Sequence, residues 1–167
     1  NNIYEVNGYQ FVMVSQDTQR PNDESSSYAY LHSPDTISWF DKAMDTAEDK
    51  SNGKPIFVGM HPNATNTVYG SYQINGIKEG KATKSSYWST NELYDALKDH
   101  SNAVTFSGHS HWVMPNERSI HQKDFTSLNT GSVNNMEADE GAWDEPFQPK
   151  RYGSNENEST GYYIEVN

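Results

Sequence analysis

The stretch that decides the fold is Val104–Trp112, which reads V-T-F-S-G-H-S-H-W. Its first half is β-branched and aromatic, as in a short buried strand. Gly108 then favours a sharp turn, because glycine tolerates backbone conformations that other residues avoid. His109 and His111 follow one residue apart, so both imidazoles are expected to project from one turn. Loops at the carboxyl ends of strands in α/β sheets are common ligand sites.

A third histidine occupies an equivalent place in the chain. Pro55–Met60 (P-I-F-V-G-M) reads as another apolar strand, and His61 follows it directly. If the two strands are neighbours in one parallel sheet, His61, His109 and His111 converge on one edge. Because imidazole is the commonest metal ligand, the pattern predicts a metal site. The alternative is that each histidine is an ordinary surface-loop residue.

The first half of the chain carries clear local signals. Ile3–Ser15 is predicted to form a β-hairpin around Asn7-Gly8, a favoured two-residue turn. A helix is predicted from Pro34, with Ser33 as its N-cap and apolar residues at helical spacing. Ser51-Asn52-Gly53 should end that helix before the strand that precedes His61.

The second half of the chain is also predicted to contain a helix followed by strands. Ser89 and Glu92 form a capping box for a second helix, and Ala103–Ser107 is the strand that delivers the histidine turn. Phe125–Leu128 and Gly161–Val166 are predicted as further strands. The resulting order predicts an α/β fold, a mixed sheet with flanking helices, in which residues 1–167 form a single domain.

Composition limits the function classes. The chain has 167 residues and a formal net charge of -11, so its surface repels phosphate backbones and nucleic-acid binding is not expected. An anionic substrate would need local positive charge, which bound metal ions supply. No cysteine is present, which leaves His, Asp, Glu and Asn as metal ligands. No apolar run is long enough to predict a membrane span.

The three histidines and the sequence around them resemble a known protein family. His61 after a strand, followed later by Gly108-His109-Ser110-His111, looks like the last two metal motifs of the calcineurin-like metallophosphoesterase superfamily. The sequence around these motifs is similar to that of bacterial phosphohydrolases of that superfamily. The similar pieces run from Ile3 onward and include G-K-P-I-F-V at 53–58, T-V-Y-G-S at 67–71, R-S-I at 118–120 and D-F-T-S-L-N-T at 124–130.

The resemblance implies both a fold and an activity. It implies a four-layer α/β/β/α sandwich that holds two divalent metal ions, of Mn, Fe, Zn or Ni. His61 and His109 would bind one ion and His111 the other. The implied enzyme is a phosphatase or phosphodiesterase, a hydrolase that attacks a phosphate-ester substrate with a metal-activated water.

The chain departs from the family pattern in its first half. The Asp-x-His, Gly-Asp-x-x-Asp and Gly-Asn-His-Asp/Glu motifs do not occur, so no catalytic residue is assigned. The chain therefore resembles the C-terminal part of a catalytic domain, and its expected partner is the missing N-terminal half. By itself this fragment is expected to hold at most one metal ion, weakly, and to show little or no phosphatase activity.

Several residues carry secondary expectations. Tyr69, Ser110 and Trp112 are candidates for substrate contact because they flank the histidine turns. His32 is expected at the surface, and His100 in the last turn of a helix, where a cation suits the helix dipole. His121 is expected either in a solvated hairpin or facing the substrate pocket.

Two other functions fit the same residues. One is a non-catalytic surface binding or scaffold domain of this fold. The other is a single-metal hydrolase that uses the three histidines and a local carboxylate such as Asp17. The absence of cysteine and the Asn-rich, acidic composition slightly favour an extracellular or cell-surface location over the cytoplasm.

Overall fold

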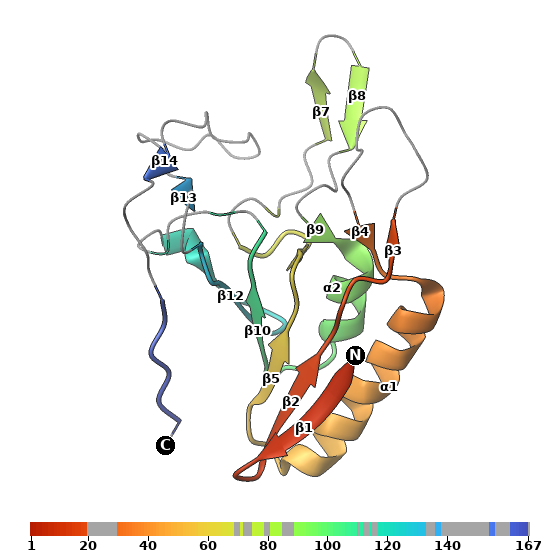
Figure 1. Cartoon of the computed structure of the whole chain (residues 1–167), viewed down its shortest axis with the longest axis vertical. Coiled ribbons are helices and arrows are strands. Elements are labelled where there is room, and N and C mark those ends of the chain that lie inside the picture. The colour runs from red at the N-terminus through yellow and green to blue at the C-terminus, as the bar shows by residue number, and fades with distance from the viewer. Residues whose placement is uncertain are drawn as a thin grey trace.

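The computed structural model describes residues 1–19, 30–68, 71, 75–78, 81–84, 89–109, 111, 114, 117–132, 136–137, 154–155 and 161–166. Within these residues, one six-stranded mixed sheet is packed against two α-helices (Figure 1). The strand order across the sheet is β1-β2-β5-β10-β12-β11. The six strands are β1 (Asn2–Val6), β2 (Tyr9–Met13), β5 (Ile56–Gly59), β10 (Ala103–Ser107), β11 (Ile120–Gln122) and β12 (Thr126–Asn129). The α/β class and the mixed sheet predicted from the sequence are confirmed.

Several short strands and a 3-10 turn lie outside this sheet or lead into it. Four two-stranded ladders of the described residues pair short segments outside it. They are β3 (Thr18–Gln19) with β4 (Tyr30–Leu31), β6 (Asn63–Ala64) with β9 (Ser89–Thr90), β7 (Asn75–Lys78) with β8 (Lys81–Lys84), and β13 (Met136–Glu137) with β14 (Ser154–Asn155). A 3-10 turn, η1 (Glu117–Ser119), leads into β11.

The N-terminal hairpin and the first helix form as predicted. Asn7 and Gly8 both adopt positive φ, 53° and 78°, which is the backbone of a two-residue hairpin turn between β1 and β2. Helix α1 (Pro34–Ser51) begins after Ser33, whose hydroxyl accepts the Thr36 amide at 3.2 Å. It ends at Asn52, in the left-handed region at φ 52°. Local side-chain chemistry therefore sets these boundaries.

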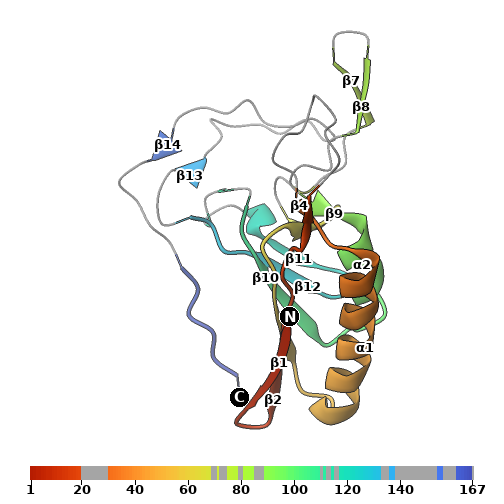
Figure 2. The same cartoon turned by 45° about the vertical axis from the view of Figure 1, so that its right-hand side comes forward.

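Four neighbouring strands are parallel, and this arrangement puts both helices on one face. β2 pairs in parallel with β5, β5 with β10, and β10 with β12. Helix α1 connects the first pair and α2 (Asn91–Leu97) the second, and both connections step across the sheet in the same direction. Because such crossovers are right-handed, both helices are expected on the same face, and Figure 2 shows them there.

The core lies between these helices and the sheet. It is made of apolar side chains with at most 9 % exposure, and fully buried members come from every layer. They include Val12, Phe40, Met44, Ile56, Val58, Leu93 and Leu97. Burying each large side chain of this kind stabilises the fold by about 1.5–3 kcal/mol.

The opposite face of the sheet is also apolar. Phe57 stacks between Phe11 and Phe106, with ring centroids 5.0 and 6.1 Å away. Tyr4 lies opposite Phe11 on β1 and remains 52 % exposed, and Met13 remains 43 % exposed. No α-helix of the described part of the chain packs on this face (Figure 2). We call the side chains on this side the open face.

Two expected elements differ from the structure. Gly161–Val166 forms no strand, although its alternating pattern predicted one. A strand needs a hydrogen-bonded neighbour as well as a pattern, and no described segment forms a ladder with it. Helix α2 begins at Asn91 rather than directly after Ser89, because the backbone at Ser89 pairs with Asn63 in the β6–β9 ladder.

Neither α-helix in the described ranges combines the length and the apolar character that crossing a lipid bilayer requires.

Candidate functional site

The two histidine-bearing turns leave the sheet side by side. β5 and β10 are parallel neighbours, with Phe106 opposite Gly59. The ladder continues beyond both strands, because the Gly108 amide donates to the carbonyl of His61 at 3.1 Å. The parallel arrangement predicted for these strands is therefore present, and it places His61 next to the Gly-His-Ser-His turn.

The imidazoles gather at this edge of the sheet. The ring centroids of His61 and His109 are 4.9 Å apart, with their planes at 63°. Burial, which disfavours the charged ring, lowers the pKa of His61, and the nearby His111 lowers it further. His61 and His109 are thus in contact, and His111 is close enough to act electrostatically on His61.

The backbone at this turn differs from the expectation. Gly108 does not adopt positive φ; instead His109 and His111 do, at 65° and 58°. The left-handed region costs an L-residue about 1–2 kcal/mol, although histidine enters it more readily than most. A Cβ at Gly108 would lie 3.7 Å from Thr130 Oγ1, an ordinary contact distance. The strain therefore falls on the two candidate ligands, and such strain is typical of functional sites.

Side chains that sequence reasoning missed hold the turns together. Asn63 is fully buried two residues after His61, and its Oδ1 accepts a hydrogen bond from Ser107 Oγ at 2.5 Å. Ser107 is the last residue of β10, directly before the Gly-His-Ser-His turn. A polar residue two positions from a histidine in each turn, Asn63 after His61 and Ser107 before His109, is the sequence signal that could have pointed to this pair.

The carboxylate considered for a single-metal site has another role. Asp17 accepts hydrogen bonds from the Ser33 amide at 2.7 Å, the Ser33 hydroxyl at 2.6 Å and the Thr36 hydroxyl at 2.7 Å. These bonds, those from Ser33 foremost, lower the pKa of Asp17 to about 2. Asp17 is therefore committed to the first turn of α1, which removes the support for a three-histidine, one-aspartate centre.

The donor set fits a metal ion in kind but not in full. Imidazole nitrogens suit Mn, Fe, Zn or Ni. In the described ranges, however, no three His, Asp or Glu side chains stand in an arrangement that could hold an ion. Within these residues, His61, His109 and His111 therefore do not by themselves make up such a group.

The remaining candidates fall into two groups. Tyr69, Ser110 and Trp112, predicted to contact substrate, lie outside the described residues. His121 lies opposite Ser127 on the edge strand β11, and burial lowers its pKa. His32 is half-buried rather than at the surface, and neither of its ring nitrogens has a hydrogen-bond partner in the described part of the chain.

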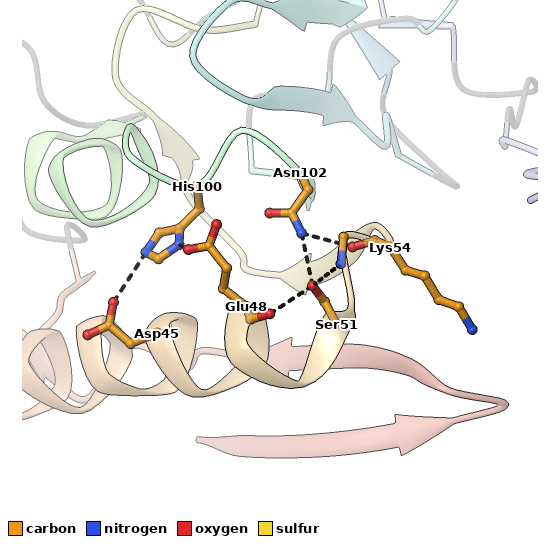
Figure 3. Close-up of polar contacts among 7 residues, drawn as sticks. Asp45, Glu48, Ser51, Lys54, His100 and Asn102 are labelled. Carbon is orange, nitrogen blue, oxygen red and sulfur yellow. Dashed lines mark hydrogen bonds and ion pairs between the residues drawn. The ribbon is translucent and has the colours of Figure 1, made fainter.

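His100 has a structural role that differs from the predicted one. It lies beyond the end of α2, and its ring reaches across to α1 (Figure 3). Its Nδ1 lies 2.6 Å from Glu48 Oε2, and its Nε2 lies 3.9 Å from Asp45 Oδ1. Beside it, the side-chain amide of Asn102 donates to Ser51 Oγ at 3.2 Å. This cluster ties the loop before β10 to the last turns of α1 and is separate from the histidine turns.

Comparison with known proteins adds no assignment to this geometry. No family model matches the chain, and no curated protein matches it either.

Proposed function

We propose that this chain is the C-terminal part of a metal-dependent phosphoric ester hydrolase of the calcineurin-like type, with His61, His109 and His111 as metal ligands. The observation that carries the proposal is the contact between two imidazoles from neighbouring parallel strands, with ring centroids 4.9 Å apart. The positive φ of His109 and His111 supports it, because residues held in the left-handed region cluster at functional sites.

The chemistry of such a site divides between the ions and the chain. Bound divalent ions would polarise a phosphate ester and activate water at neutral pH. The chain would contribute imidazole nitrogens from two turns at one edge of the sheet. Because the whole chain carries a net charge of -11, local positive charge from ions is also what would attract an anionic phosphate ester.

We further propose that the sheet is one half of a four-layer α/β/β/α sandwich. The open face supports this, because aromatic side chains cover it while both α-helices lie on the other side (Figure 2). A second sheet from an N-terminal half would bury Tyr4 and Met13 and would supply the carboxylates of the centre. A scaffold domain that has lost the chemistry shares this architecture but needs no histidine cluster.

The test is to measure metal binding by the unaltered chain and then by variants that each lack one of the three histidines. Calorimetric titration of the metal-free chain with Mn²⁺ or Zn²⁺ should show about one weakly held ion per chain. His61→Ala, His109→Ala and His111→Ala should each weaken binding. His121→Ala, on the edge strand β11, is the matched control and should leave binding unchanged.

Two results would overturn the proposal. One is an absence of binding by the unaltered chain, which would favour the scaffold domain. The other is binding that survives all three substitutions. Hydrolysis of p-nitrophenyl phosphate by this chain with added Mn²⁺ should be slight, and robust turnover would show that the assignment of the carboxylates to a missing half is wrong.

A further inference from the structure

Asn63 is placed to couple the two histidine turns. It follows His61 by two residues, is 0 % exposed, and accepts a hydrogen bond from Ser107 Oγ at 2.5 Å. Ser107 is itself 1 % exposed and precedes Gly108-His109. A single buried contact therefore joins the residue two positions after one candidate ligand to the residue two positions before the other.

Ser107 extends this contact to a third strand. Its carbonyl accepts the Thr130 amide at 2.7 Å and the Thr130 hydroxyl at 3.0 Å. Its hydroxyl also lies 3.4 Å from the carbonyl of Leu128 on β12. The ends of β10 and β12 and the turn after β5 thus meet at Ser107, directly before the Gly-His-Ser-His turn.

Stability alone does not explain an amide at this position. The Nδ2 atom of Asn63 is buried and donates to no partner in the described ranges. A buried donor without a partner costs about 1–3 kcal/mol, which an apolar side chain of similar shape would avoid. Attachment of a glycan at Asn63-Ala64-Thr65 gives no reason either, because Asn63 has no exposed surface in the folded chain.

We propose that Asn63 is a positioning residue that acts through Ser107 to hold His61 and His109 at the separation needed for joint binding of one ion. The binding part of this inference rests on the proposed function. The positioning part concerns the metal-free chain and can be tested without any ion.

The first measurement is made without metal. Ring protons of His61 and His109 should give nuclear Overhauser cross peaks in the unaltered chain, because the ring centroids are 4.9 Å apart. Asn63→Leu and Ser107→Ala should each weaken these cross peaks. Asn63→Asp, which keeps the acceptor for Ser107, should retain them. Unchanged cross peaks in both Asn63→Leu and Ser107→Ala would overturn the inference.

The second measurement is ion affinity. Asn63→Leu and Ser107→Ala should each reduce Zn²⁺ affinity by about 10- to 100-fold, the usual effect of losing a residue that orients a ligand. Asn63→Leu should have little further effect in the Ser107→Ala background, because both act through one contact. Ile56→Val, at the far end of β5, costs about 0.5–1.5 kcal/mol of stability and should leave affinity unchanged.

The two measurements separate the possible failures. If the unaltered chain binds no ion, the proposed function fails, while the ring cross peaks still decide the positioning role. If it binds ions and Asn63→Leu binds them equally well, Asn63 does not position the ligands.

Discussion

Replacing His109 by glycine and by alanine separates the strain at the histidine turn from the loss of the imidazole. His109 has φ 65°, in the left-handed region. Both variants lose the ring, but alanine keeps the cost of a left-handed L-residue, about 1–2 kcal/mol. Glycine avoids this cost and gives up about 0.5–1 kcal/mol because its unfolded chain is more flexible. His109→Gly should therefore be more stable than His109→Ala by about 1 kcal/mol.

The measurement is urea unfolding of the two variants, with the same pair at Asp41 as a matched control. Asp41 is exposed in the middle of α1, where glycine is less favourable than alanine by about 1 kcal/mol. The sign of the difference should thus reverse between the two positions. In thermal unfolding the expected difference at His109 is about 2–4 °C for a chain of this size. A His109→Gly variant less stable than His109→Ala, as at Asp41, would refute the left-handed backbone.

Two further predictions concern histidines outside the site. His100→Ala should destabilise the chain by about 1–2 kcal/mol, because it removes a partly buried hydrogen bond between the buried His100 ring and Glu48. In a double-mutant cycle with Glu48→Ala, measured by urea unfolding, the two losses should be clearly less than additive, and full additivity would argue against the contact. His32 has a pKa lowered from 6.5, chiefly by burial, so below pH 6.5 the unfolded chain takes up a proton that the folded chain resists. The free energy of unfolding should therefore fall as the pH drops from 6.5 towards the lower folded-state pKa, and His32→Phe should flatten that slope; an equal slope in the variant would contradict the buried, neutral ring.

The parts of the fold that could be predicted are those fixed by neighbouring residues. Asn7-Gly8 can form its turn without the rest of the chain, and Ser33 caps a helix whose first residue is the next one along. Gly161–Val166 shows the limit of such reasoning, because its pattern permits a strand while pairing depends on a distant segment. The same dependence moved the start of α2, where pairing of Ser89 with Asn63 competes with the helix.

In the candidate site, too, only some of the features could be predicted from the sequence. That His61 lies beside the Gly-His-Ser-His turn could be predicted, because the carboxyl ends of neighbouring parallel strands share one edge. The Asn63–Ser107 hydrogen bond could not, since it depends on strand register to the residue. The left-handed backbone at His109 also escaped prediction, because Gly108 offered an easier place for the turn.

The proposed half-sandwich and the proposed metal site lead to one joint prediction. Both α-helices lie on one side because successive right-handed crossovers moved in one direction, and the aromatic residues on the other side need a layer of their own (Figure 2). In the proposed metal site, carboxylate ligands would have to come from the proposed N-terminal half, because no three His, Asp or Glu side chains of the described residues are grouped to hold an ion. One added sheet would satisfy both needs, because its own strand ends would lie at the same edge as His61 and His109. A chain with the open face made polar, for example Tyr4→Lys with Phe11→Thr, should therefore lose assembly with such a half while its own metal-free histidine turn stays intact.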